Sequence, residues 1–221
     1  MNSCCRGFCA SVGRHFDTTV AQGDLDRYRR KGPNTTTRLM RDGILSSGGA
    51  GTVLDVGAGI GALSFELLAA GFSGATVVDT APAYVAAARQ EAARLNRASQ
   101  LEVVEGDYVA MARSLPVADV VALDRVVCCY PAYEPLLQAA ALHSRSLLAL
   151  SYPRGRWYVY LVVALQNLAR RVVGNSFRTF IYAPGSMEAL IRGLGFRRAS
   201  RRGTLVWCID VYARETPLEG S

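Results

Sequence analysis

The chain has almost no lysine and very few histidines. Lys31 is the only lysine among 25 basic residues, and His15 and His143 are the only two histidines. The arginine bias is typical of a GC-rich genome, and the arginines are scattered rather than interleaved with aromatic residues along one stripe. The net charge of +7 therefore does not predict a nucleic-acid partner, although it suits an anionic substrate or an anionic membrane surface.

A long hydrophobic run is also lacking. The most apolar stretch, Trp157 to Leu165, is far shorter than the roughly 20 residues that a helix needs to span a bilayer. The N-terminal residues contain no apolar core of the kind that a signal peptide requires. We therefore expect a cytoplasmic protein without a transmembrane segment, whose cysteines are free thiols rather than disulfides.

The six cysteines do not form a Cys-x-x-Cys pair. Cys4, Cys5 and Cys9 together with Cys128 and Cys129 could gather around a soft metal ion. Adjacent cysteines, however, seldom bind one ion together without strain. We therefore predict no metal site and interpret these residues as buried or free thiols.

The composition is that of a globular protein, because half of the residues are hydrophobic and 19% are charged. Apolar strands alternate with helical segments, which predicts a parallel sheet with right-handed crossovers. The last two strands, 196–202 and 204–213, are joined by a loop too short for a crossover and must pair antiparallel. We predict one α/β domain with a Rossmann-like, doubly wound sheet of about seven strands, mostly parallel with one antiparallel strand near the C-terminus.

Residues 1–45 are predicted to form an N-terminal arm followed by cap helices. Met1 to Arg14 is interpreted as a poorly ordered arm. Two helices are expected, at 24–30 and 35–44, because Gly32-Pro33 stops one and starts the next. Asn34 or Thr35 can cap the second helix. The remaining residues, 46–221, are expected to form the ligand-binding domain.

Residues 154–184 interrupt the strand–helix alternation as an insertion. Its first part, Trp157 to Leu165, is apolar, and the following part is polar and basic. We predict a helix with a large apolar face and an exposed basic end. This helix either packs into the core or forms a lid over an apolar substrate, with three arginines available for an anionic group: Arg154, Arg156 and Arg178.

A glycine-rich turn follows the first predicted strand, in the stretch 53–61. Gly57, Gly59 and Gly61 stand at alternate positions, and a helix-forming run begins at Ala62. Because glycine has no Cβ, such a turn lets a ligand lie against bare backbone amides. The fingerprint of dinucleotide-binding proteins is formally met as Gly57-x-Gly59-x-x-Ala62.

Three acidic residues accompany this turn. Asp55 stands two residues before the first glycine, and Asp79 ends the second strand, 20 residues beyond Gly59. At about this spacing an acidic residue reaches a ribose hydroxyl in a βαβ unit. The third strand runs into Asp107-Tyr108.

With these motifs in this order, the chain resembles the class I S-adenosyl-L-methionine (SAM)-dependent methyltransferases over roughly residues 25 to 214. The resemblance implies that SAM is the cofactor, held by a loop of Gly57, Gly59 and Gly61. It implies that Asp79, with Thr80 beside it, binds the ribose, and that Asp107 with Tyr108 lies at the adenine. Asp55 is expected to order the loop or to meet the methionine amino group, and the N-terminal helices to lie over the cofactor.

The fourth predicted strand ends in Asp124, and ligands in open α/β sheets bind at such strand ends. We therefore place Asp124 and Tyr130 near the transferring methyl group, as catalytic candidates, with Asp124 also contacting the cofactor. The segments 119–131 and 151–158 resemble magnesium-protoporphyrin O-methyltransferases, which act on a propionate of a flat apolar ring. That family tends to carry a histidine where this chain has Cys129.

The resemblance implies methyl transfer to a carboxylate or hydroxyl of a small molecule, expected to be apolar and anionic. A general base is needed only if the acceptor arrives protonated. Two alternatives remain open. A nicotinamide-dependent oxidoreductase uses the same fingerprint, but a single lysine at Lys31 allows no Tyr-x-x-x-Lys pair. The second alternative is a non-catalytic protein that binds SAM or a metal. The oligomeric state is not predicted.

Overall fold

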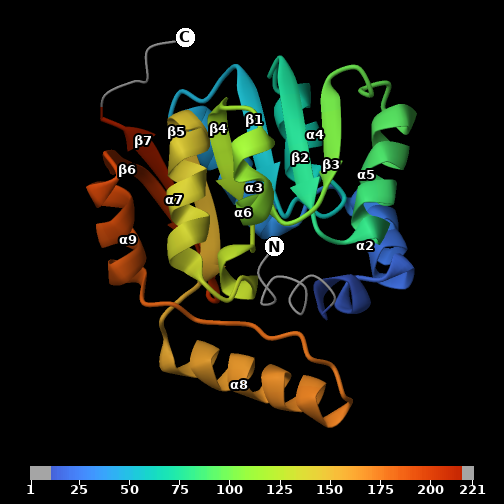
Figure 1. Cartoon of the computed structure of the whole chain (residues 1–221), viewed down its shortest axis with the longest axis vertical. Helices are drawn as coiled ribbons and strands as arrows, with labels where there is room; N and C mark the ends of the chain where they lie inside the picture. The colour runs from blue at the N-terminus through green and yellow to red at the C-terminus, as the bar shows by residue number, and fades with distance from the viewer. Residues whose placement is uncertain (1–10, 216–221) are drawn as a thin grey trace.

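The computed structural model describes residues 11–215, which form a sheet between two layers of helices (Figure 1). The strand order within these residues is β3-β2-β1-β4-β5-β7-β6. The strands are β1 (Thr52–Val56), β2 (Gly74–Asp79), β3 (Leu101–Glu105), β4 (Ala118–Leu123), β5 (Ser144–Pro153), β6 (Phe196–Gly203) and β7 (Trp207–Arg214). Strands β1 to β5 run parallel, and β7 is antiparallel to β5 and to β6. The predicted fold class is confirmed.

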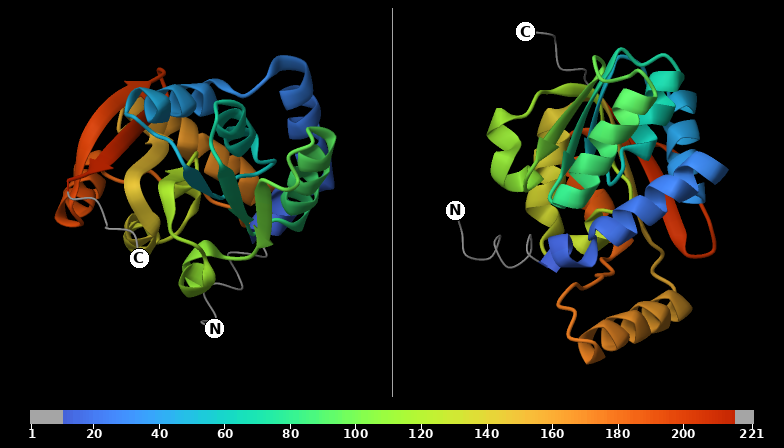
Figure 2. Two further views of the ribbon diagram at one scale, coloured as in Figure 1. Left: turned by 90° about the horizontal axis from the view of Figure 1, so that it is seen from above. Right: turned by 90° about the vertical axis from the view of Figure 1, so that its right-hand side faces the viewer.

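The helices cover both faces of the sheet, as Figure 2 shows from above. Their bounds are α2 (Thr18–Lys31), α3 (Thr35–Ser46), α4 (Ala62–Ala69), α5 (Pro82–Arg94), α6 (Tyr108–Met111), α7 (Tyr133–His143), α8 (Trp157–Val172) and α9 (Pro184–Gly193). Helices α3, α4 and α5 bury apolar side chains against one face of the sheet. Helices α6, α7 and α9 bury theirs against the other. The central strands β1, β2 and β4 are largely apolar because most of their residues are buried.

The two N-terminal helices are separated where the sequence predicts it. Gly32 ends α2 with a positive φ of 71°, and the Asn34 side chain caps α3 by accepting from the Thr37 amide at 3.0 Å. Helix α2 begins earlier than predicted, at Thr18, because Asp17 caps it.

A buried carboxylate fixes α2 against the sheet. The Glu91 side chain of α5 is fully buried and lies between Arg29 of α2 and Arg94, with N–O distances of 2.8 and 2.6 Å. A buried acid is stable there because both of its oxygens are paired. Helix α2 is thereby held over the end of the sheet at which the strands β1 and β2 finish.

Part of the predicted N-terminal arm is ordered. Residues 11–15 are helical, and Ser11 and Val12 are buried, because Val12 packs in a cluster with Leu25 and Phe177. The prediction of a poorly ordered arm is therefore wrong for residues 11–14. Cys4, Cys5 and Cys9 lie outside the described residues.

The C-terminal hairpin has a longer loop than predicted. Strand β6 includes Gly203, and Thr204 to Val206 make the connection, with the Thr204 hydroxyl accepting from the Trp207 amide at 3.0 Å. The hairpin places β7 between β5 and β6, so the last strand of the chain is not the outermost one.

Helix α8 stands apart from the three layers, below the sheet in Figure 1. It buries only Val159 and Val163. The predicted insertion helix is thus present, but most of it does not pack into the core. Among residues 11–215, no helix is long and apolar enough to cross a bilayer.

Candidate functional site

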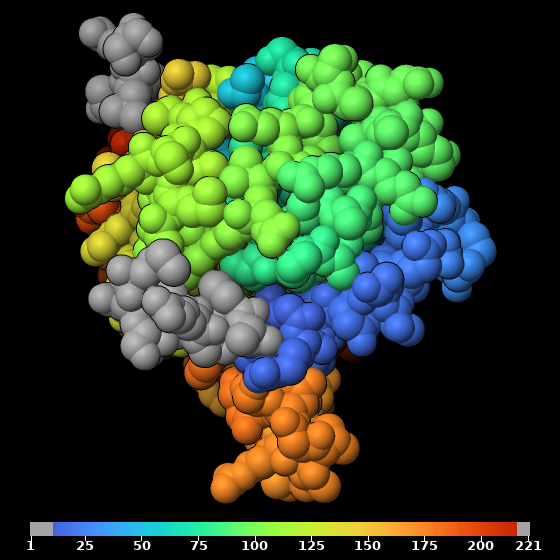
Figure 3. All heavy atoms as spheres, turned by 45° about the vertical axis from the view of Figure 1, so that its right-hand side comes forward, coloured from blue at the N-terminus to red at the C-terminus, as the bar shows by residue number. Residues whose placement is uncertain are grey.

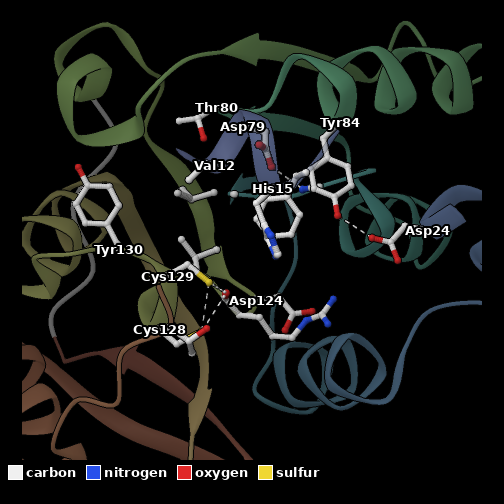
Figure 4. Close-up of a pocket in the computed structure, with 18 of the residues that line it drawn as sticks. Val12, His15, Asp24, Asp79, Thr80, Tyr84, Asp124, Cys128, Cys129 and Tyr130 are labelled. Carbon is white, nitrogen blue, oxygen red and sulfur yellow. Dashed lines mark hydrogen bonds between the residues drawn. The ribbon is translucent and has the colours of Figure 1, made fainter. Parts of the chain in front are cut away.

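A cavity of about 440 Å³ lies at the carboxyl ends of β1, β2, β3 and β4 (Figure 4). The strand order reverses between β1 and β4, the place at which open α/β sheets bind ligands. The volume lies within the range of roughly 300 to 1,000 Å³ that small-molecule sites occupy. Nine predicted site residues line the cavity: Asp55, Gly57, Gly59, Asp79, Thr80, Asp107, Tyr108, Asp124 and Tyr130.

Gly61 is the one predicted residue that does not line the cavity. It is the N-cap of α4, in the left-handed conformation with φ at 79°. A Cβ there would lie 3.4 Å from the Phe65 ring and 3.8 Å from Ala88, which belong to the interior beneath the turn. The pattern of three glycines therefore combines two residues of the cavity wall with one that starts the helix.

Gly57 has a steric reason to be glycine. Its φ is 60°, and a Cβ at this position would lie 2.6 Å from a methyl group of Val126. Two amides of the turn already have acceptors within the protein. Gly57 donates to the Val78 carbonyl at 2.7 Å, and Gly59 donates to Asp79 at 2.8 Å. At Gly57 and Gly59 the turn therefore offers a ligand an absence of side chains rather than free donors.

Asp79 is fixed by the backbone around it. One carboxylate oxygen accepts from the Gly59 amide and the other from the Ala81 amide, each at 2.8 Å. Burial raises the pKa of Asp79, and these hydrogen bonds oppose that effect. Each oxygen keeps a second lone pair, and the side chain lines the cavity beside Thr80.

Asp55 lies beneath the glycine turn and is 1% exposed. The Ser64 hydroxyl donates to its carboxylate at 2.9 Å. Burial raises the pKa of Asp55 to about 7; the Ser64 hydrogen bond opposes this effect, and the negative charges of Asp124 and Asp79 add to it. A cation placed in the cavity would favour the ionised form.

Asp107 and Tyr130 form a pair at the end of β3. Asp107 caps α6 by accepting from the Val109 amide at 3.0 Å, and the Tyr130 hydroxyl donates to the same carboxylate at 3.0 Å. In Figure 4 the Tyr130 hydroxyl points away from Asp124. The two catalytic candidates therefore line one cavity without facing each other, and the Tyr130 hydroxyl is engaged by Asp107.

Tyr108 lines the cavity, while its hydroxyl lies in the core. The side chain is 3% exposed, and its hydroxyl is hydrogen-bonded to His143 Nδ1 at 2.8 Å. His143 Nε2 lies 2.7 Å from the Ala112 carbonyl. This pair connects α6 to α7 and places His143 in the core, a position that no sequence pattern predicts.

Asp124, at the end of β4, is surrounded by hydroxyl donors. Thr37 of α3 donates to one oxygen at 2.5 Å, and Ser151 of β5 donates to the other at 2.7 Å. Ser151 in turn accepts from the amide of Arg125, whose φ of 62° is unusual for a residue with a side chain. The resemblance predicts helices over the cofactor, but no signal in the sequence points to Thr37 as a partner of Asp124.

The cavity has two parts of different chemistry. The strand-end half is formed by Asp55, Gly57, Gly59, Asp79 and Asp107. The helix half lies beside it and is largely apolar, with a few polar and charged groups that include Asp24 and Arg27 of α2. Its lining residues include Phe16, Val126, Val159, Val163, Phe177 and Trp207, with His15, Cys128, Cys129, Arg125 and Arg170.

His15 was not predicted to line this site. Its ring stacks on Phe177, with centroids 4.3 Å apart, and Asn175 donates to Nδ1 at 3.0 Å. Asn175 uses its other terminal atom, Oδ1, to accept from the Phe177 amide, so Nδ1 is an acceptor and the proton resides on Nε2. Burial and the charge of Arg170 lower the pKa of His15, so the ring is neutral near pH 7.

Cys128 and Cys129 are adjacent thiols at the boundary of the two halves. Their sulfur atoms are 3.6 Å apart, and both lie 3.4 Å from the Arg125 carbonyl. The hydrogen bond from Cys128, with the charges of Arg125 and Arg170, lowers the pKa of the Cys129 thiol. The residues from 11 to 215 contain no group of three or more metal-ligating side chains.

Comparison with known proteins agrees with this architecture. Residues 53–148 match the family described as the methyltransferase domain. The structure of magnesium protoporphyrin IX methyltransferase from Synechocystis PCC 6803, with bound SAH, superposes with a TM-score of 0.71 at 20% identity, covering 92% of this chain and 98% of that one.

Two further structures show the same fold. An O-methyltransferase family protein from Burkholderia thailandensis gives a TM-score of 0.72 at 18% identity, covering 90% of this chain and 61% of that one. Human N-acetylserotonin methyltransferase in complex with SAM gives 0.64 at 20% identity, covering 90% and 56%. Comparison with curated protein sequences gave no match.

Residues 53–148 are thus a methyltransferase domain, set in the fold of the class I enzymes. Over the rest of the chain, the structural neighbours show the fold of the SAM-dependent methyltransferases. The match of residues 53–148 to a methyltransferase domain favours this class over the nicotinamide-dependent oxidoreductase.

The residues at the strand ends fit this cofactor. SAM is cationic at its sulfonium and amino groups and carries a ribose. Five carboxylates line the cavity: Asp24, Asp55, Asp79, Asp107 and Asp124. The turn at Gly57 and Gly59 leaves the wall free of side chains beside them. Charge and space are therefore both suited to an amphipathic cationic nucleoside.

Proposed function

We propose that this enzyme transfers the methyl group of SAM to a carboxylate, or else a hydroxyl, of a small acceptor with a large apolar body. The observation that carries the proposal is the division of one cavity into two halves. The strand-end half is acidic and free of side chains at the turn, and the helix half is apolar with basic groups. A cationic cofactor and an apolar anion would occupy the two halves side by side.

In the strand-end half, we assign Asp79 to the ribose hydroxyls, because its fixed carboxylate has lone pairs left to accept from them. Asp107 is assigned to the adenine amine, with Tyr130 as a positioning residue that holds the carboxylate through its hydroxyl. Asp55 is assigned to the amino group of the methionine part, because a buried carboxylate with a raised pKa gains from a neighbouring cation.

In the helix half, three groups are available for an anionic acceptor: Arg125, Arg170 and His15. Arg170 lies 5.3 Å from the Phe177 ring centroid and donates to Thr179 at 3.0 Å, which places its charge at the wall of the cavity. A neutral His15 with its proton on Nε2 can donate to an acceptor oxygen. The apolar lining residues accommodate the body of the acceptor.

The surroundings of Asp124 favour an acceptor that needs no general base. Both of its oxygens already accept hydrogen bonds, from Thr37 and from Ser151. This arrangement supports a role for Asp124 in orienting the cofactor and the loop at Arg125 rather than in removing a proton. SAM supplies a methyl group on a positively charged sulfur, and a carboxylate can attack it directly once the two are aligned.

A porphyrin propionate is one acceptor of this class. The segments 119–131 and 151–158 resemble the magnesium-protoporphyrin enzymes, and one such enzyme shares the fold over nearly its whole length. Cys129 occupies the position at which those enzymes tend to carry a histidine. Magnesium protoporphyrin is therefore the first acceptor to try, beside apolar carboxylic acids and phenols that lack a macrocycle.

The experiment that tests the proposal combines SAM binding with an acceptor panel. Calorimetry with SAM should give a dissociation constant in the micromolar range, typical of a cofactor site. Incubation with methyl-deuterated SAM, followed by mass spectrometry, should yield a methyl ester or ether with at least one panel member. Binding of SAM without product from any carboxylate or hydroxyl, but with product from an amine or thiol acceptor, would overturn the proposal.

A further inference from the structure

The face of α8 that points away from the cavity carries a continuous row of exposed apolar side chains. Successive residues of a helix are turned by about 100°. Val159 and Val163, which line the cavity, lie on one side, and five residues lie on the opposite side. These five, called here the outer stripe, are Trp157, Leu161, Leu165, Leu168 and Val172, with exposed fractions of 77, 53, 57, 58 and 78%.

The hairpin loop between β6 and β7 extends this apolar surface. The Tyr158 hydroxyl donates to the Leu205 carbonyl at 2.8 Å, and the Arg154 amide donates to the Val206 carbonyl at 2.7 Å. The loop is therefore fixed beside the first turn of α8. Leu205 at the tip of the loop is 82% exposed. Exposed apolar surface of this extent marks an interaction site.

The charges around the outer stripe have one sign. Between Glu134 and Glu188 the chain has no acidic residue and six arginines. Arg156, directly before α8, and Arg171, in its last turn, are exposed, and neither forms an ion pair within the described residues. Figure 3 shows the α8 region projecting from the body of the molecule.

We propose that the outer stripe of α8, with Leu205, docks onto an anionic lipid bilayer, with the helix lying in the plane of the interface. An apolar stripe flanked by arginines and carrying a tryptophan is what such a surface binds. A second copy of the chain fits poorly, because the contact would bring two sets of arginines together without an acidic partner. The helix is not of a length to span the bilayer, so it lies on it.

In this arrangement α8 has the lipid surface on its outer side and the helix half of the cavity on its inner side. Val162, 45% exposed and also a cavity-lining residue, lies at the edge between the two. The docking surface does not include the strand-end half. Membrane binding and SAM binding are therefore separable by mutation.

The test is flotation of the full-length protein with vesicles of phosphatidylcholine alone or with about 30 mol % phosphatidylglycerol. We expect binding to the anionic vesicles, weakened by salt. The triple variant Leu161→Gln, Leu165→Gln, Leu168→Gln should lower partitioning by on the order of 100-fold while keeping its affinity for SAM. Leu142→Gln, at a leucine 70% exposed on α7, is the matched control and should bind like the wild type.

Two further measurements complete the test. Arg156→Gln and Arg171→Gln should each lower partitioning roughly fivefold. In a Trp207→Phe background, the emission of Trp157 should shift to shorter wavelength when anionic vesicles are added. The proposal is overturned if the wild type does not float with anionic vesicles, or if the triple variant floats as well as Leu142→Gln. It is also overturned if the outer stripe instead mediates a dimer in vesicle-free buffer, detected by light scattering and lost in the triple variant.

Discussion

The two halves of the cavity are held in place by different means. In the strand-end half, the backbone fixes the side chains: Asp79 accepts from two amides, and Asp107 caps a helix. In the helix half, the side chains are fixed by contacts between residues far apart in the sequence, such as the stacking of His15 on Phe177. The first half lies at the ends of the sheet strands, and part of the second lies on α8, of which only two residues are buried.

This difference has a physical consequence for what each half can recognise. Groups fixed by the backbone hold one ligand in one position without paying much ordering entropy. Side chains on loosely packed segments can adapt to different ligands. A change of acceptor therefore requires substitutions only in the helix half. We expect substitutions in the strand-end half to affect SAM binding, and substitutions in the helix half to affect the acceptor.

The largest effect should come from Gly57→Val, which disrupts the glycine turn in the strand-end half. The positive φ disfavours a side chain, and the added atoms meet Val126. SAM binding measured by calorimetry should be abolished. Gly185→Val, at a glycine with open space around its Cα, is the control and should leave binding unchanged.

Because Gly57→Val could also unfold the protein, two milder variants complete this test. One is the single variant Gly57→Ala, and the other is the double variant Gly57→Ala, Val126→Ala. Removing the Val126 side chain relieves the contact and should restore part of the affinity. An unchanged affinity of Gly57→Ala would show that the turn does not face the cofactor.

Asp79→Asn should weaken SAM binding on the order of 50-fold, because a charged acceptor to the ribose is lost. The matched control is Asp119→Asn. Asp119 also accepts from a backbone amide, that of Thr52 at 2.7 Å, but at the opposite end of the sheet. Its replacement should lower the melting temperature without changing the affinity for SAM. Equal losses of affinity in both variants would indicate a general effect on the fold.

Arg170→Gln tests the helix half. It should raise the KM for an anionic acceptor roughly tenfold and leave the dissociation constant of SAM unchanged. The exposed neighbour Arg171→Gln serves as the control in vesicle-free assays. A change in SAM affinity equal to the change in KM would contradict the separation of the two halves.

Asp55 should make SAM binding depend on pH. Its pKa of about 7 in the free protein means that below pH 7 the carboxyl must lose a proton to meet a cation. The affinity should therefore rise about fivefold from pH 6 to 7 and level off above about pH 8. Calorimetry in two buffers of different ionisation enthalpy should detect the released proton. Asp55→Asn should bind weakly and without this dependence, and a wild-type affinity that falls with rising pH would contradict the assignment.

The same shift has an effect on stability with a definite sign. The folded pKa lies above the unfolded value near 4, so the stabilising protonated form is lost as the pH rises from about 4 through 7. The unfolding free energy of the wild type should therefore fall relative to that of Asp55→Asn across this range, measured by urea titration without SAM. Parallel curves for the two proteins would show that burial does not raise this pKa.

The smallest effect should come from Tyr130→Phe. Loss of the hydroxyl that donates to Asp107 should weaken SAM binding about threefold to tenfold, with little change in kcat, if Tyr130 acts by positioning. Tyr158→Phe, which removes a hydroxyl bonded to the Leu205 carbonyl, is the control. A large fall in kcat with unchanged SAM affinity would instead place Tyr130 at the reacting atoms.

The amino-acid sequence by itself determined the strand-end half. A strand, a glycine turn and a helix are local, so the positions of Gly57 and Gly59 follow from neighbours within a few residues. Parallel strands bring their carboxyl ends to one edge of the sheet. Recognition of the strands therefore predicts that Asp79 and Asp107 lie at the same edge. The antiparallel final strand followed from the shortness of its loop.

Only the tertiary structure decided the helix half. Thr37 reaches Asp124 across 87 positions, and His15 reaches Asn175 across 160. No periodicity or spacing encodes such contacts, because they depend on how whole elements pack. The apolar stretch of α8 was visible in the sequence, but which of its sides faces the cavity and which faces outward depends on the packing of Val159 and Val163. Local geometry is determined by adjacent residues, whereas contacts between residues far apart in the sequence are fixed only when the chain has folded.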